Sequence, residues 1–147
     1  MMRVLVDSDV VISALKGDEA QSAACQLLMD ALINGEFLAV TTPVIMANIQ
    51  YVLGRRWAVK RGIPDRPRVV RAMNDLLPLF SMVHVTPAHF YASMASTFVD
   101  LEDGLQHFAA IHARGRVDGI VTCNVKDYDG HSQLPVFEPG EFAHDYL

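Results

Sequence analysis

The 147-residue sequence has only two cysteines, Cys25 and Cys123, and they are far apart in the chain. Two cysteines at this distance form neither a disulfide framework nor the closely spaced Cys and His pairs of a zinc site. The sequence also lacks internal repeats and low-complexity segments, which excludes solenoids and disordered tails. A reducing compartment is the simplest setting for such a chain, so we expect a cytoplasmic protein.

Long uninterrupted hydrophobic runs are absent as well. The two longest uncharged stretches, residues 37–54 and 76–99, are broken by Pro43 in the first and by Pro78 and Pro87 in the second. Neither supplies the roughly 20 continuous apolar residues that a membrane-spanning helix needs. No basic region followed by an apolar core opens the sequence, so we expect no signal peptide and no contact with a membrane.

Basic residues are scarce outside one segment. Positions 55–71 hold seven of the twelve Lys and Arg residues and one acidic residue, so this segment carries +6 and the remainder −11, for a net charge of −5. The seven are Arg55, Arg56, Lys60, Arg61, Arg66, Arg68 and Arg71. An acidic protein with one basic patch can bind nucleic acid through it. A solvent-exposed helix–turn–helix surface explains the same charges equally well.

The remaining sequence predicts one α/β domain over residues 1–147, because its length and its 51% hydrophobic content suffice for a core. Strands are expected at Arg3–Val6, Phe37–Thr41, Met82–Val85 and Gly119–Thr122, with a fifth candidate at Pro135–Phe137. Helices are expected at Ala20–Ile33, from Pro43 to about Lys60, from about Pro67, from Pro87 to Phe98, from Leu101 to about Ala113 and at Glu141–Tyr146, with a turn at 62–64. This alternation predicts a three-layer α/β/α sandwich with a central parallel sheet of four to five strands.

Acidic and amide side chains fall where predicted strands end and helices begin. Asp7 directly follows the first strand, and burying a carboxylate there costs several kcal/mol unless it is paired. Asp103 lies in the first turn of a predicted helix, and Asn124 and Asp127 follow the fourth strand. The carboxyl ends of parallel strands share one edge with the starts of the following helices, so these side chains are expected to converge.

Converging carboxylates repel one another unless a cation lies between them. Oxygen ligands suit Mg²⁺ or Mn²⁺, and we expect Asp7 and Asp103 to bind the ion. Such a site assists the attack of water on a phosphodiester. Structural alternatives exist: Asp100 as a helix cap only, Glu102 and Asp103 as charges that complement the helix dipole, and Asp127 as a turn residue.

Three segments carry a family resemblance: Val4–Leu15 (VLVDSDVVISAL), Leu101–Gln106 (LEDGLQ) and Val121–Tyr128 (VTCNVKDY). In this order and spacing they resemble the PIN-domain family of metal-dependent nucleases, whose bacterial members include VapC-type toxins. The resemblance implies that Asp7 and Asp103 are catalytic. It assigns supporting roles to Glu102, Asn48, Thr122, Asn124 and Asp127, and we expect Asp9 to be a supporting residue on the loop after the first strand.

Asn48 departs from the family pattern, which usually has a glutamate early in the second long helix. Asn48-Ile49-Gln50-Tyr51 resembles a PIN subgroup with Asn-Ile-x-Tyr at this point. An amide offers a neutral oxygen, so the site carries one negative charge fewer, and we predict weaker metal binding.

The leading hypothesis is a metal-dependent endoribonuclease that is the toxin of a toxin–antitoxin pair. In it, basic residues contact RNA phosphates or the acidic part of an antitoxin protein; these are Arg55, Arg56, Lys60, Arg61 and Arg68. The resemblance also implies a homodimer.

Two alternatives remain open. A non-catalytic PIN-like module that binds RNA or protein is favoured by the amides at Asn48 and Asn124. A phosphatase of the haloacid-dehalogenase type is suggested by Asp7-Ser8-Asp9, although Lys126 lies too near the late acidic residue to serve as a separate motif.

Overall fold

In the computed structural model, residues 1–18 and 20–147 are described. The elements in chain order are β1 (Arg3–Val6), α1 (Ser8–Lys16), α2 (Ser22–Ile33), β2 (Leu38–Thr41), α3 (Pro43–Arg56), β3 (Ala58–Lys60), β4 (Ile63–Pro64), α4 (Arg66–Leu76), the 3₁₀ helix η1 (Leu77–Leu79), β5 (Phe80–Met82), α5 (Pro87–Ala95), α6 (Leu101–Ile111), β6 (Gly119–Val121), α7 (Val125–Tyr128), β7 (Val136–Phe137) and α8 (Pro139–Tyr146). Five strands in the order β5-β2-β1-β6-β7 form one sheet with parallel neighbours throughout. The predicted α/β/α sandwich with a parallel central sheet is confirmed.

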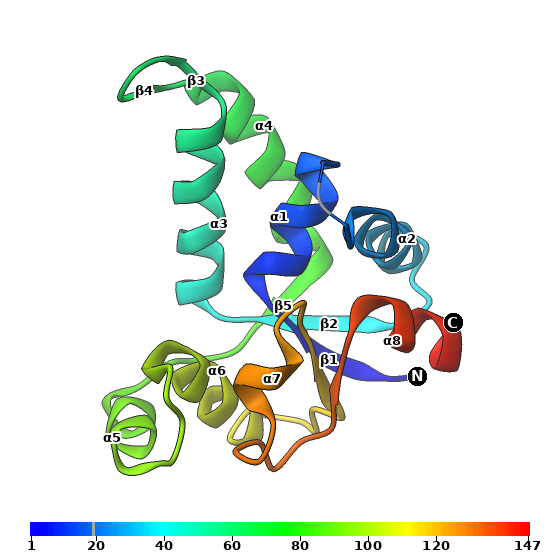
Figure 1. The fold of residues 1–147 in the computed structure, drawn as a ribbon, viewed down its shortest axis with the longest axis vertical. Coiled ribbons are helices and arrows are strands. Elements are labelled where there is room, and N and C mark those ends of the chain that lie inside the picture. The colour runs from blue at the N-terminus through cyan, green and yellow to red at the C-terminus, as the bar shows by residue number, and fades with distance from the viewer. Residues whose placement is uncertain (19) are drawn as a thin grey trace.

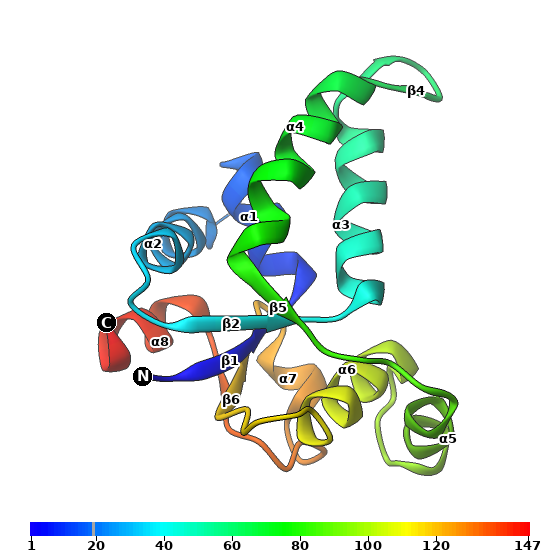
Figure 2. The ribbon, with the colours of Figure 1, turned by 180° about the vertical axis from the view of Figure 1, so that it is seen from behind.

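Helices cover both faces of this sheet (Figures 1 and 2). Helices α1, α2, α3 and α4 lie on one side, and α5, α6 and α7 lie on the other. Helix α8 packs beside α2. The small antiparallel hairpin β3–β4 joins α3 to α4 at their ends far from the sheet. Within the described part of the chain, no helix is long and apolar enough to span a membrane.

The strand order reverses between β1 and β6. The chain leaves β1 towards β2 and β5, and it then returns to form β6 on the opposite side of β1. Asp7 closes this pairing, because its backbone N–H donates to the carbonyl of Val121 at 3.0 Å. Ligands of open α/β sheets bind at the carboxyl ends of the strands where the strand order reverses in this way. The fold therefore marks the edge beside Asp7 as the expected site.

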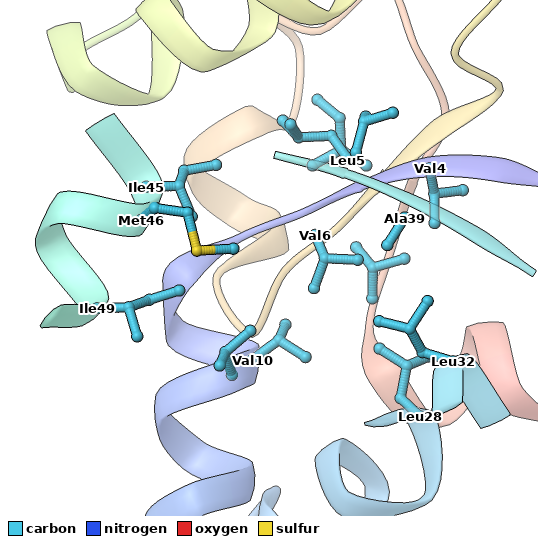
Figure 3. Packing of buried hydrophobic residues seen from close by; sticks show 14 of the residues in the cluster. Val4, Leu5, Val6, Val10, Leu28, Leu32, Ala39, Ile45, Met46 and Ile49 are labelled. Carbon is cyan, nitrogen blue, oxygen red and sulfur yellow. The ribbon is translucent and has the colours of Figure 1, made fainter. Parts of the chain in front are cut away.

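The centre of the core is β1, in which Val4, Leu5 and Val6 are fully buried. Three consecutive apolar residues suit a central parallel strand because helices cover both of its faces. Figure 3 shows Val6 on the side of the sheet that faces Val10 of α1, whereas Leu5 points to the opposite side. This packing fixes the end of β1, and with it the backbone of Asp7.

Helix caps explain several boundaries that the sequence predicted. Asp100 caps α6, since its Oδ1 accepts hydrogen bonds from the N–H groups of Glu102 at 2.8 Å and Asp103 at 3.2 Å. Thr86 caps α5, and its N–H donates to Nδ1 of His89 at 3.1 Å. Because each cap fixes the first turn of its helix, Asp103 is held at the sheet edge.

Helix α1 was not predicted from the sequence. The structure places Asp9 in its first turn, so the expectation of a loop there is wrong. The β-branched residues of this segment are poor helix formers, but Val10, Val11 and Ile12 are buried against the sheet, and this packing outweighs local propensity. Gly17, at φ 73°, ends the helix in the left-handed region that glycine adopts without strain.

Other boundaries also differ from the prediction. Helix α3 ends at Arg56 instead of about Lys60, and a hairpin replaces its predicted last turn and the turn at 62–64. The third strand is Phe80–Met82, because these residues pair with Ala39–Thr41 of β2. Helix α5 stops at Ala95 instead of Phe98, where Ser96 turns to extended backbone and its hydroxyl donates to the Ser93 carbonyl.

Three further helix ends shift by a few residues. Helix α2 begins at Ser22 instead of Ala20, α6 ends at Ile111 instead of about Ala113, and α8 begins at Pro139 instead of Glu141. Helix ends vary by one or two residues between assignments, so these shifts leave the architecture unchanged.

Candidate metal-dependent active site

A hydrogen-bonded row of three carboxylates lies at the carboxyl ends of β1 and β6. The Tyr128 hydroxyl is 3.4 Å from Asp103 Oδ1 and 3.3 Å from Asp7 Oδ2. The Thr122 hydroxyl is 3.2 Å from the same Asp7 oxygen and 3.2 Å from Asp9 Oδ2. Each hydroxyl has one proton, so each donates to only one of its two carboxylates at a time. The row therefore alternates acid and hydroxyl, in the order Asp103, Tyr128, Asp7, Thr122, Asp9.

Asp7 is held from several directions. It caps α1, and its Oδ1 accepts the N–H of Ser8 at 2.7 Å, while Thr122 and Tyr128 face Oδ2. Because helix N-termini favour negative charge, the start of α1 offsets part of the cost of burying this carboxylate. The carboxylate orientation is therefore set before any ligand binds.

Asp9 is anchored more firmly than the sequence suggested. Its two oxygens lie 3.2 and 3.1 Å from the backbone N–H of Cys123, and Asn124 Nδ2 donates to its Oδ2 at 3.0 Å. These contacts tie the start of α1 to the segment after β6. Asp9 thus fixes the start of α1, which Asp7 caps, and the side-chain amide of Asn124 contributes one of the hydrogen bonds that hold Asp9.

Burial, and for two of the groups neighbouring charges, raise the pKa values of the three carboxylates. Burial first, and then the charge of Asp7, raise the pKa of Asp9 to about 6. Burial, followed by the charges of Asp7, Asp100 and Asp127, raises the pKa of Asp103 to about 7. Burial also raises the pKa of Asp7. Groups with raised pKa values are typical of functional sites, and a cation offsets the repulsion between neighbouring carboxylates.

The predicted supporting residues occupy different positions around the row. Asn48 of α3 donates from Nδ2 to the hydroxyl of Ser8 at 3.0 Å, and Ser8 directly follows Asp7 in the chain. Asp127 is exposed in α7, but its charge reaches Asp103. Glu102 is exposed on α6, and burial followed by the charges of Asp100 and Asp7 raises its pKa.

The oxygen-only donor set fits Mg²⁺ or Mn²⁺. Within residues 1–18 and 20–147, no group of three or more His, Cys, Asp and Glu side chains is arranged to hold a metal by itself. Mg²⁺ is usually bound through one or two carboxylates, with water and substrate phosphates as its other ligands. Asp7 and Asp103, bridged by one hydroxyl, are the pair that matches this pattern.

The basic segment is divided between two surfaces. Arg55, Arg61 and Arg66 line a groove of about 1000 Å³ between α3, the hairpin and α4. Arg68 lines a second groove of about 890 Å³ between α1, α2 and α4, and its guanidinium stacks 4.1 Å from the Trp57 ring centroid.

Two other basic residues of this segment are placed apart from the first groove. Arg56 forms an ion pair with Asp18, and Lys60 lies exposed on β3. The basic segment, predicted as a single patch, therefore lies on two separate surfaces. Of the two grooves, the first has arginines and no acidic residue among its described lining, whereas the second also contains acidic residues.

Tyr128 was missed by the sequence reasoning. Its ring is buried and packs edge-on against Phe98, so its pattern is that of a core aromatic. The signal that distinguishes it is the hydroxyl, because a phenol in the core needs a polar partner. The partners of this hydroxyl are Asp7 and Asp103, which lie 121 and 25 residues away in the sequence, so no local sequence pattern predicts them.

Two comparisons with known proteins concern the family and the fold of this chain. The sequence model of the PIN domain matches residues 3–126. A chain of the crystal structure of VapBC2 from Rickettsia felis, bound to a DNA fragment from their promoter, superposes with a TM-score of 0.64. The two chains share 12% identity, over 93% of this chain and 98% of that one, so the likeness concerns the fold. A search of curated proteins gives no match. This chain belongs to the PIN-domain family, whose members are generally nucleases.

Proposed function

We propose that this protein is a metal-dependent endoribonuclease and the toxin of a toxin–antitoxin pair. The observation that carries the proposal is the row of Asp103, Asp7 and Asp9, held by two hydroxyls where β1 and β6 end. In this proposal, residues 1–147 act as one domain, and Asp7 and Asp103 bind Mg²⁺ or Mn²⁺. When bound, the ion lowers the pKa of a water molecule and offsets the charge that develops on the phosphate.

The protein's own residues orient the two ligands. Tyr128 spaces Asp7 from Asp103, and Thr122 and Ser8 fix the carboxylate plane of Asp7. Such outer contacts matter because their loss typically weakens metal binding by about 10–100-fold. Asn48, Asn124, Asp127 and Glu102 surround the site and shape its charge.

RNA phosphates are proposed to contact the basic segment, in particular Arg55 and Arg61, with Arg56, Lys60 and Arg68 at its margins. Arginine forks bind phosphate oxygens and position a strand without reading its sequence. The net charge of +6 on positions 55–71, in a chain of net −5, supports this surface over others.

An antitoxin protein and a second copy of the chain are the proposed partners, in the cytoplasm. The likeness to a VapBC2 chain supports the antitoxin. Exposed apolar side chains on and after α5 support a homodimer, because a cluster of this kind marks an interface. They are Phe90, Tyr91, Met94, Val99 and Leu101, each at least 51% exposed.

Incubation of a mixed-sequence RNA with the purified protein tests the activity. Cleavage is expected with Mn²⁺ or Mg²⁺, none in EDTA, and none for Asp7→Asn in the presence of metal. Asp75→Asn removes an exposed carboxylate from α4 and is the matched control, expected to cleave as wild type does. Equal cleavage by Asp7→Asn and wild type would contradict the proposal.

A nuclease-inactive binding module is the second candidate. The observation that favours it is the use of both amides in internal hydrogen bonds, Asn48 to Ser8 and Asn124 to Asp9. RNA binding without cleavage in any divalent metal would select this candidate. The phosphatase alternative has no support from the family match.

A further inference from the structure

The groove between α3, the hairpin and α4 has the chemistry of a nucleic-acid subsite. Its lining is largely apolar and includes Ala47, Gly54 and Val69. Three arginines border it, and none of its described lining residues is acidic. A groove lined by apolar residues and arginines suits a ligand that is flat and apolar in one part and anionic in another.

Tyr51 and Arg55 form a prepared contact at the edge of this groove. The Tyr51 side chain is 61% exposed, although it belongs to a helix whose opposite side enters the core. Arg55 Nη1 donates to the Tyr51 hydroxyl at 3.0 Å, and its guanidinium carbon lies 5.8 Å from the ring centroid. This contact holds the ring at the surface with a positive charge beside it.

These two residues lie on a face of α3 that begins near the carboxylates. Asn48, Tyr51 and Arg55 follow one another at spacings of three and four residues, which places them on one face of α3. At 1.5 Å per residue, Tyr51 is about 5 Å and Arg55 about 10 Å further along the helix axis than Asn48. Asn48 itself bonds Ser8, the neighbour of Asp7. The α3 surface thus leads from the active site to the groove.

We propose that Tyr51 is a stacking platform for one base of a single-stranded RNA, and that the strand then enters the groove. This inference rests on the proposed function, because it supplies the path of that substrate. Arg55, Arg61 and Arg66 bind the phosphates that follow the stacked base. Stacking on an aromatic ring combined with a cationic groove is how proteins hold single strands with little sequence preference.

The exposed ring favours RNA over an acidic peptide. Carboxylates of a peptide would engage the three arginines, but they gain little from a flat aromatic face. A nucleotide uses both features, because its base can stack on the Tyr51 ring while a phosphate contacts the Arg55 guanidinium beside it.

Fluorescence anisotropy with a labelled, unstructured RNA in EDTA tests the proposal without any cleavage. Tyr51→Ala is expected to weaken binding by about 5–150-fold, the usual range for one stacked base. Tyr51→Phe keeps the ring and is expected to bind near the wild-type value. Arg55→Ala is expected to weaken binding and to reduce the salt dependence by about one phosphate contact. Arg114→Ala, an equal charge loss on an exposed residue after α6, is the matched control.

An oligonucleotide with abasic sugars separates stacking from charge. Wild type and Tyr51→Ala are expected to bind it equally, because it has no base to stack. Circular dichroism of each variant shows whether the fold is kept. An unchanged affinity of Tyr51→Ala for the normal RNA would overturn the proposal, as would an equal loss for the abasic strand.

Three further outcomes discriminate between this inference and the others. A poly-glutamate peptide that displaces RNA, with no effect of Tyr51→Ala on either ligand, would identify a peptide site and overturn the stacking role. RNA binding that depends on Tyr51 without cleavage in Mn²⁺ would support the stacking role while the proposed nuclease activity fails. If Tyr51→Ala cleaves and binds RNA as wild type does, the proposed nuclease activity is supported and the stacking role of Tyr51 is overturned.

Discussion

Replacing Asp103 with asparagine is expected to stabilise the metal-free protein. The carboxylate lies in a row with Asp7 and Asp9, and burial followed by the charge of Asp7 raises its pKa from 3.8 to about 7. At 1.36 kcal/mol per pKa unit, this difference corresponds to at most about 4 kcal/mol. Because Asp103 is partly exposed, solvent screening reduces the value, and we expect a gain of about 1–2 kcal/mol above pH 7.

The pH dependence follows from the direction of this pKa. Between pH 4 and pH 7 the folded protein keeps a proton on Asp103 that the unfolded chain has released, so stability falls as the pH rises. Asparagine does not titrate. The advantage of Asp103→Asn is therefore small at pH 4, grows up to pH 7 and stays constant at higher pH.

Thermal unfolding followed by circular dichroism measures the effect. For a chain of this size, 1–2 kcal/mol corresponds to a rise in Tm of about 2–8 °C at pH 8 in EDTA. Mn²⁺ should reverse the order, since an ion at 100 times its Kd stabilises wild type by about 2.7 kcal/mol. Asp75→Asn controls for the loss of an exposed charge. No gain at pH 8, or an equal gain at pH 4, would refute the reasoning.

Three other changes follow from the same geometry. Asn48→Glu restores a negative charge beside the site and is expected to bind Mn²⁺ more tightly in calorimetric titration; equal affinities would refute the role of this amide. Tyr128→Phe removes the hydroxyl between the two ligands and is expected to weaken Mn²⁺ binding by about 10-fold or more, with the fold retained. Gly119→Ala would place its Cβ 2.7 Å from Cε2 of Phe137, and urea unfolding should show a loss of about 1–3 kcal/mol.

The parts of the site that the sequence predicted are those set by local signals. Asp7 follows a run of buried residues that only a strand explains, and Asp100 carries the pattern of a helix cap, which places Asp103 within the first turn. Parallel strands then bring these positions to one edge without any knowledge of contacts. Pattern and topology were sufficient for the two proposed ligands.

The features that escaped prediction depend on contacts between distant segments. Tyr128 reads as a core aromatic, and only the approach of Asp7, 121 residues away, gives its hydroxyl a role. Asp9 was expected on a loop, whereas burial of Val10 and Val11 against the sheet stabilises a helix that begins one residue before it. The hairpin after Arg56 replaced a predicted helical turn because strand pairing, invisible in the periodicity, competes there.

The β3–β4 hairpin lies apart from the carboxylates and borders the groove. The hairpin packs against α3 and is separate from the five-stranded sheet that sets the carboxylates. Insertions or exchanges between Ala58 and Pro64 are therefore expected to change the shape of the groove and to leave the row of carboxylates in place. Ligand binding in the groove could in this way change by directed evolution of one short hairpin, independently of the sheet.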